Sequence, residues 1–184
     1  MKYLLLIALL FAVSCDNASV IWEKLRKTYS RAGTAGIMGN LEAESALKSV
    51  IYQNSYKNRV GLTDQQYVNQ VNSGAYSEYK FVHDSVGFGL AQWTYYSRKQ
   101  GLYDKCKKGR GDIGNLSCQV DFVLDELKGT KLANYLKTTT DVYTATSRVC
   151  KEYERPAVNN IDTRYNYIEG SLDRKSGSAG MPRP

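Results

Sequence analysis

Two glutamates, Glu42 and Glu44, lie in the segment GIMGNLEAES at 36–45, which reads as a helix rich in small residues. Each residue of a helix advances about 100°, so Glu44 shares a face with Leu41, whereas Glu42 points away toward water. A carboxyl group held against apolar side chains keeps its proton to higher pH, which is what a general acid requires. The spacing therefore favours Glu44 for proton transfer. A structural pairing of Glu44 with an Arg or Tyr side chain is the alternative.

A second segment that could bind a ligand is GFGLAQWT at 87–94. Its glycines permit a tight turn and let a ligand approach the backbone. Gln92 can donate and accept hydrogen bonds, and Trp93 offers a flat ring, a combination typical of sugar-binding clefts. The segment is not a phosphate loop, because it lacks the Gly-x-x-x-x-Gly-Lys pattern.

Composition excludes several other classes of site. The chain has 184 residues, one histidine and a net charge of +7, or +6 once Lys2 is removed. A single His and the lack of Cys-x-x-Cys argue against a metal site, and no cofactor motif is present. The basic residues are scattered and no nucleic-acid-reading motif occurs, so the charge favours anionic wall polymers as partners, or simply solubility.

The first residues, MKYLLLIALLFAVS, predict a signal peptide over 1–14, with cleavage after Ser14. We therefore expect a secreted or extracytoplasmic monomer without stable membrane association, and a catalytic domain over 15–174. Lipid attachment at Cys15 is the alternative, although the usual Leu three residues earlier is missing. The last residues, 175–184, predict a disordered tail.

The four cysteines form an even set in a chain that is expected to be exported, which favours two disulfides. Four cysteines allow three connectivities. We favour Cys106 with Cys118, across neighbouring helices, and Cys15 with Cys150.

The elements that must position these residues are mostly helical. Apolar spacing predicts helices over 19–31, from Thr34 through the 36–45 segment to about Leu47, and from about Leu90 to Cys106. The Thr63–Gln66 capping box predicts a helix that continues to Val71. Further helices are predicted over 116–127 and near 130–137, 141–153 and 162–173. Alternation over 74–86 predicts a small β-hairpin or extended loop, in which His83 is a partly exposed residue. The fold class is α+β, mainly helical.

Three motifs together resemble the phage tail lysozyme family of the lysozyme superfamily. They are Gly-Asn-Leu-x-x-Glu-Ser at 39–45, Gly-x-Gly-Leu-Ala-Gln-Trp-Thr at 87–94, and Tyr-Glu-Arg-Pro at 153–156. The resemblance runs from about Val20 to Leu172. The Glu-Ser pair followed by Gly-Leu-x-Gln is also similar to goose-type lysozymes and lytic transglycosylases.

This resemblance implies a two-lobed lysozyme-like fold with a cleft between the lobes. It implies cleavage of the β-1,4 bond between N-acetylmuramic acid and N-acetylglucosamine in bacterial peptidoglycan, with Glu44 as the acid. The substrate-binding residues expected from this match and from the nearby aromatic residues are Gly89, Gln92, Trp93 and Tyr95. The late motif, Tyr153, Glu154 and Arg155, is expected to brace the catalytic helix.

Glycoside hydrolysis usually needs a second carboxylate, close to the first for retention or about 6.5–9.5 Å away for inversion. The candidates are Asp84, which we favour, and Glu78 on the predicted hairpin. If neither faces Glu44, a single-acid route is left, in which the substrate's own hydroxyl attacks and forms an anhydro sugar, as in lytic transglycosylases. A wall-binding protein without turnover is the remaining alternative.

Overall fold

The computed structural model describes residues 17–176, apart from the side chains of Arg59 and of residues 169–176. The chain is mainly helical, as predicted, and its residues fall into two compact units. Unit 1 contains the described residues up to Lys24 together with Glu44–Glu126, and unit 2 contains Leu25–Ala43 and the described residues from Leu127 onward. None of the helices in the described part is long and apolar enough to cross a membrane.

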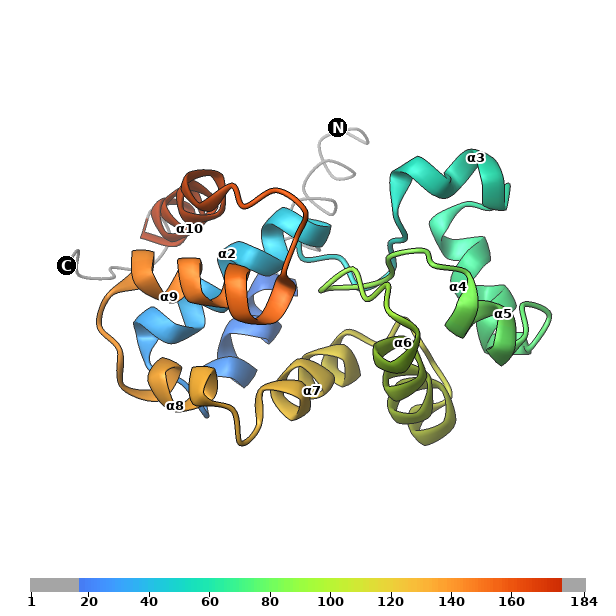
Figure 1. The fold of residues 1–184 in the computed structure, drawn as a ribbon, viewed down its shortest axis with the longest axis horizontal. Helices are drawn as coiled ribbons and strands as arrows, with labels where there is room; N and C mark the ends of the chain where they lie inside the picture. The colour runs from blue at the N-terminus through green and yellow to red at the C-terminus, as the bar shows by residue number, and fades with distance from the viewer. Residues whose placement is uncertain (1–16, 177–184) are drawn as a thin grey trace, which may run out of the picture. The chain divides into compact units, whose positions relative to one another are not determined.

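Unit 1 is built from short helices joined by ordered turns (Figure 1). After a helical stretch that starts at residue 17, it contains η1 (Asn54–Tyr56), α3 (Lys57–Val60), α4 (Asp64–Ser73), α5 (Glu78–His83), α6 (Tyr96–Leu102), the π-helical η2 (Tyr103–Lys108) and nearly all of α7 (Leu116–Leu127). The core of this unit is aromatic, because Tyr67, Phe81 and Phe88 are fully buried against one another.

Unit 2 packs helices around most of α2 (Arg31–Ser45). The other helices are α8 (Lys131–Thr138), α9 (Val142–Val149), the π-helical η3 (Cys150–Glu154) and α10 (Ile161–Ser176). Glycines in α2 permit this packing, since a Cβ at Gly36 would lie 2.7 Å from the Ala145 side chain in α9, and one at Gly39 would lie 2.5 Å from the Arg164 carbonyl in α10. The small residues of α2 therefore serve helix packing within unit 2.

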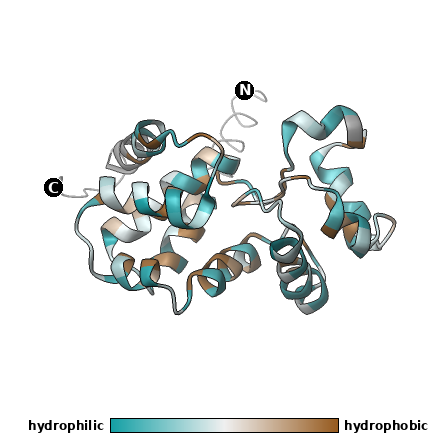
Figure 2. Cartoon of the chain, viewed as in Figure 1, coloured by the Kyte–Doolittle hydropathy of each residue, from teal (hydrophilic) through white to brown (hydrophobic). Residues whose placement is uncertain are grey.

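Some local start signals in the sequence give the expected helices, but the start expected at Thr34 is wrong, because α2 begins at Arg31 and Ser30 accepts the hydrogen bond from Gly33 N. Thr63 accepts a hydrogen bond from the Gln66 backbone while the Gln66 side chain accepts one from the Thr63 backbone, so the predicted capping box opens α4. The amphipathic stretch over 116–127 forms α7, along which Figure 2 shows hydrophobic, brown residues. The helices predicted near 130–137, 141–153 and 162–173 are also present.

The predicted hairpin or extended loop at 74–86 is wrong, because residues 78–83 form helix α5. Ser77 caps this helix by accepting a hydrogen bond from the Lys80 backbone. The buried residues are the neighbours Phe81 and Val82, which a helix can bury together but a half-buried strand cannot. The alternation in the sequence was therefore coincidental.

Extended backbone pairing occurs instead at a different place in unit 1. Among the described residues, Phe88 forms isolated antiparallel bridges with Tyr52 and with Trp93. The candidate ligand-binding segment at 87–94 is thus a tight, hydrogen-bonded turn rather than the start of a helix, and α6 begins only at Tyr96.

The predicted signal peptide over 1–14 and the possible lipidation site at Cys15 lie outside the described residues. The predicted tail over 175–184 begins inside α10, which extends to Ser176, and its remaining residues are likewise outside.

Candidate functional site

The last turn of α2 carries Glu44 and ends abruptly after it. Ala46 and Leu47 have φ values of 52° and 56°, a left-handed conformation that is unusual for residues other than glycine. The helix therefore stops at Ser45, close to the predicted end at Leu47. Consecutive strained residues of this kind tend to be kept where they position a functional group.

Burial does not separate the two glutamates of α2 as the helical wheel predicted. Glu42 and Glu44 are both half-buried. Glu44 differs from Glu42 in belonging to unit 1, because the boundary between the units falls between Ala43 and Glu44. It therefore shares a compact unit with the turn at 87–94.

The strand-like segment that follows Glu44 is fixed to the turn by backbone hydrogen bonds. Gly89 N donates to Ile51 O over 2.8 Å, and Gln53 N donates to Gly87 O over 2.8 Å. Residues 51–53, which begin six residues after the end of α2, are thus attached to the 87–94 segment.

The buried side chain of Gln119 in α7 clamps these two segments together, because it forms hydrogen bonds with the backbone of both. Its side chain is fully buried; its amide nitrogen donates to Ser49 O over 3.0 Å and its oxygen accepts from Leu90 N over 2.9 Å. A third bond, to Ile113 O over 2.8 Å, anchors the amide near the disulfide loop. Sequence analysis missed Gln119, because a polar residue on an apolar helix face gives no sign of its distant partners.

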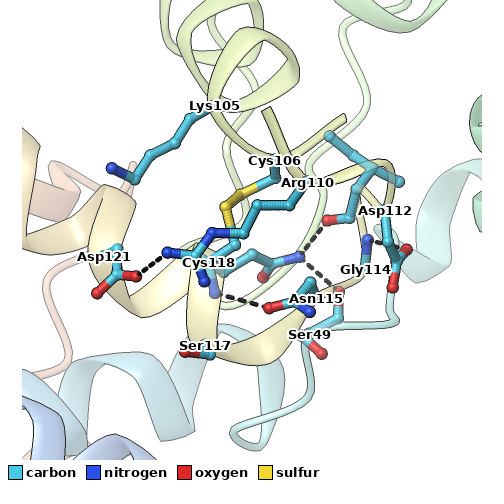
Figure 3. The surroundings of a disulfide bond; sticks show 12 residues. Ser49, Lys105, Cys106, Arg110, Asp112, Gly114, Asn115, Ser117, Cys118 and Asp121 are labelled. Atoms are coloured by element: carbon cyan, nitrogen blue, oxygen red, sulfur yellow. Dashed lines mark hydrogen bonds and ion pairs between the residues drawn. A yellow bond between two sulfur atoms is a disulfide. The ribbon is translucent and has the colours of Figure 1, made fainter. Parts of the chain in front are cut away.

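The disulfide next to this clamp is the predicted one, between Cys106 and Cys118 (Figure 3). The two cysteines are 12 residues apart in the sequence, and their bond closes a loop that ends at the start of α7. Asn115 caps this helix by accepting a hydrogen bond from Cys118 N. A closed loop of this length stabilises a fold by on the order of 3 kcal/mol. The disulfide therefore stabilises the fold next to Gln119.

Gly89 is required by the turn itself. Its φ is 72°, and a Cβ there would lie 2.5 Å from the Gln119 side-chain oxygen. The glycine therefore admits Gln119 rather than offering open space to a ligand.

Gln92 has a left-handed backbone, with φ of 44°, and is half-buried. Its side-chain nitrogen donates to Gly89 O over 3.0 Å, which folds the amide back over the turn. This bond holds the amide in one orientation, and its half-buried position leaves part of the side chain at the surface.

The expected ring platform at Trp93 lies in the core. Trp93 is fully buried, packs against Phe122 with ring centroids 5.3 Å apart, and donates from Nε1 to Glu126 over 2.8 Å. Both faces are thus enclosed, so we assign this ring to packing. Glu126 also holds Arg98 through two hydrogen bonds, of 2.6 and 2.9 Å. Tyr95, by contrast, is 63% exposed.

Asp84 lies in a buried polar cluster of unit 1. Its carboxylate pairs with the ammonium group of Lys99, accepts a hydrogen bond from Tyr67 Oη over 2.5 Å, and accepts one from Val86 N over 2.9 Å. The side chains of Lys99 and Asp84 are 0% and 6% exposed. These contacts give Asp84 a structural role, in which it fixes the backbone that leads into the 87–94 turn.

The positive charge of Lys99 is unfavourable in this position because the side chain is buried. Burial lowers the pKa of Lys99 to about 8, and the neighbouring Asp84 carboxylate opposes this shift. The ammonium group lies 4.2 Å from the centroid of the Phe81 ring and donates to Val86 O over 3.0 Å. Burial and the charge of Asp84 raise the pKa of Tyr67 well above its usual range.

Glu78, the other candidate for the second carboxylate, is bound at the surface. It accepts hydrogen bonds of 2.8 Å each from Lys108 and Gln100. The bond to Lys108 is the main cause that lowers the pKa of Glu78.

The late motif belongs to unit 2, not to the unit that holds Glu44. Tyr153 and Glu154 are half-buried at the end of η3, and Arg155 is exposed with a left-handed φ of 52°. Within unit 2, Asn40 holds α2 by donating to Thr146 O over 3.0 Å and accepting from Arg164 over 3.1 Å. Bracing of the helix by the late motif stays a prediction.

The second predicted disulfide stays a prediction, because Cys15 lies outside the described residues. Cys150 is buried, and its thiol lies 3.4 Å from Asn159 Oδ1. No group of three or more His, Cys, Asp or Glu residues in the described part of the chain is placed to hold a metal ion.

The structure thus places Glu44 and Gln92 in one unit, and residues 49–53, which follow α2, are bound to the 87–94 turn directly and through Gln119. A carboxyl group and an oriented amide suit a proton-transfer reaction on a polar substrate. A model of the phage tail lysozyme family matches residues 16–172. A search of curated proteins finds no significant match.

Proposed function

Because the chain belongs to the phage tail lysozyme family, we propose that it cleaves the β-1,4 bond between N-acetylmuramic acid and N-acetylglucosamine, with Glu44 as the general acid. The family membership assigns a lysozyme-like, peptidoglycan-degrading activity to the chain. The bond and the acid are our assignment. The observation that carries it is the position of Glu44 in the last turn of α2, two residues before the left-handed pair Ala46–Leu47 and in the same compact unit as the 87–94 turn.

In this proposal Glu44 donates its proton to the glycosidic oxygen as the bond to C1 breaks. Gln92, whose amide is fixed by Gly89 O, hydrogen-bonds the sugar next to the bond. Water then attacks C1, its proton passes to the Glu44 carboxylate and restores the acid, and a reducing muramic acid end is released. Gln119 is a positioning residue, because it acts only through the backbone of Ser49 and Leu90.

A lytic transglycosylase is a second candidate, and one observation favours it. Asp84 is occupied by Lys99 and Tyr67, and Glu78 by Lys108 and Gln100, so neither carboxylate is held ready for a water molecule. In this route Glu44 protonates the leaving oxygen, the C6 hydroxyl of muramic acid forms a bond to C1, and its proton returns to Glu44. The product is a 1,6-anhydro sugar.

Export is part of the proposal. The 1–14 segment has the pattern of a signal peptide. The Cys106–Cys118 disulfide supports an oxidising compartment, since such bonds rarely persist in the cytosol.

Digestion of purified peptidoglycan followed by mass spectrometry tests the reaction. Hydrolysis predicts fragments with reducing muramic acid ends, whereas transglycosylation predicts the same fragments lighter by one water. Wall that sediments with the protein but releases no fragments would contradict both and leave only a wall-binding role.

A further inference from the structure

A row of exposed aromatic side chains lies on unit 1, on α5 and at the start of α6. Tyr79, Tyr95 and Tyr96 are 73%, 63% and 54% exposed, and His83 is also exposed. We call these residues the aromatic strip. Exposed aromatic residues that form a contiguous patch commonly mark an interaction site, whereas isolated ones do not.

The rings of the aromatic strip contact one another in sequence. The centroids of Tyr79 and His83 lie 4.3 Å apart, those of His83 and Tyr96 lie 6.2 Å apart, and those of Tyr96 and Tyr95 lie 4.8 Å apart. His83 Nδ1 also lies 2.9 Å from Tyr79 O, one turn earlier in α5. The four rings therefore form a continuous surface.

Core packing does not account for the aromatic strip. Helix α5 already contributes Phe81 and Val82 to the interior, where they are 0% and 2% exposed. Tyr79 and His83 lie on the opposite side of the same short helix. The exposed rings thus add little to the stability of the core and keep apolar surface in water.

The chemistry of the aromatic strip fits a sugar chain. A phenol ring has an apolar face and a polar hydroxyl, which matches the apolar face and hydroxyl rim of a sugar. A nucleic-acid strand would also need cations along the strip. Of the lysines and arginines on α5 and α6, Arg98 is held by Glu126, Lys99 is buried against Asp84, and Lys80 is exposed. One exposed cation is fewer than a nucleic-acid strand needs.

The aromatic strip is continuous with the candidate site along the chain. Tyr95 follows Thr94, the last residue of the turn that presents Gln92, and Tyr95 is the N-cap position of α6. We propose that the aromatic strip is a glycan-binding surface that holds peptidoglycan strands outside the residues that cleave them. This inference rests on the proposed function for the identity of the glycan.

The test measures sedimentation with purified insoluble peptidoglycan. All variants carry Glu44→Gln, so that the wall stays intact during the measurement. We expect Tyr79→Ala/Tyr96→Ala to weaken wall binding about tenfold, because two ring faces are lost. Tyr79→Phe/Tyr96→Phe, which keeps the faces, should bind within about twofold of the parent. The matched control is Tyr143→Ala, which removes a 47% exposed tyrosine from unit 2 and should bind like the parent.

The proposal that the aromatic strip binds glycan is overturned if the double alanine variant binds wall as tightly as the parent, or if the parent does not bind at all. It is also overturned if the parent prefers single-stranded DNA to wall glycan at the same ionic strength. Circular dichroism and thermal melting establish that each variant is folded. A failure of the proposed cleavage chemistry appears separately, as a lack of released fragments from the wild-type protein, and does not alter the binding comparison.

Discussion

At the scale of single residues, Gln119 joins more of the candidate site than any residue that the sequence singled out. Its buried amide satisfies the Ser49 and Ile113 carbonyls and the Leu90 amide. An unsatisfied buried backbone group costs on the order of 1–3 kcal/mol. The loss of this side chain would thus release both the segment after Glu44 and the turn before Gln92.

We expect Gln119→Leu to lower the free energy of unfolding by about 3 kcal/mol, because an apolar side chain of similar size leaves those groups without partners. Urea denaturation measures this change. The control is Gln65→Leu, because the Gln65 amide donates to Asn69 at the exposed surface of α4 and its loss should cost less than about 0.5 kcal/mol. Equal effects of the two variants would show that the buried clamp is not a main support of unit 1.

Lys99 provides a prediction about pH. Its folded pKa of about 8 lies below the ordinary value of 10.5, so between these pH values the unfolded chain carries a proton that the folded chain has released. The contribution of Lys99 to stability therefore increases as pH rises through this window. An NMR titration of ¹³C-labelled lysine should show one resonance with a midpoint near 8, which Lys99→Arg removes. A midpoint near 10.5 would contradict the description of this buried pair.

The sequence predicted individual residues well where their neighbours are close along the chain, and poorly where they are not. The sequence pattern predicted that the helix carrying Glu44 ends near Leu47, but it could not show that Lys99 reaches Asp84 or that Glu126 accepts a hydrogen bond from Trp93. Those partners are distant in sequence. The sequence pattern therefore predicted Asp84 and Trp93 to be accessible to a substrate. In the structure both side chains are buried by tertiary contacts.

At the scale of elements, α2 is shaped by its glycines. A Cβ at Gly33 would lie 2.1 Å from the Leu136 carbonyl oxygen of α8. Backbone atoms of a neighbouring helix cannot move aside as a side chain can. The close packing of α2 within unit 2 therefore depends on the absence of side chains at these positions.

We expect Gly33→Ala to destabilise the protein by about 2 kcal/mol, because the clash exceeds the roughly 1 kcal/mol that alanine gains in helix propensity. Thermal denaturation measures the change. Gly101→Ala in α6 is the matched control, since its Cβ would meet only ring atoms of Phe122, at 3.0 and 3.1 Å, and should cost less. A stabilised Gly33→Ala variant would mean that α2 and α8 are not packed as closely as described.

The start of α4 was predictable, whereas the starts of α2 and α6 and the β element were not. Thr63 and Gln66 form their capping box from residues three apart, so the signal is complete within the sequence. The bridges of Phe88 to Tyr52 and Trp93 instead depend on a turn at Gly89 and on a segment far earlier in the chain. The alternation at 74–86 imitated a strand, whereas the cap at Ser77 was the informative feature.

At the scale of the whole molecule, the chain divides into two compact units, and α2 contributes to both. Glu44 is the first residue of unit 1 after this division, and the late motif at 153–155 lies in unit 2. The resemblance noted over Val20 to Leu172 agrees with the family match over 16–172. Family membership was therefore predictable from three short motifs, although the partners of most site residues were not.

The most direct test compares the release of soluble fragments from purified bacterial wall by the wild-type protein and by Glu44→Gln, with Glu42→Gln as the matched control in the same helix. Loss of a general acid typically reduces a rate by about 10²–10⁴-fold. We predict a loss of that size for Glu44→Gln, with normal folding, and a rate close to wild type for Glu42→Gln. Release of fragments by Glu44→Gln at the wild-type rate would contradict the assignment of the acid and the mechanism built on it.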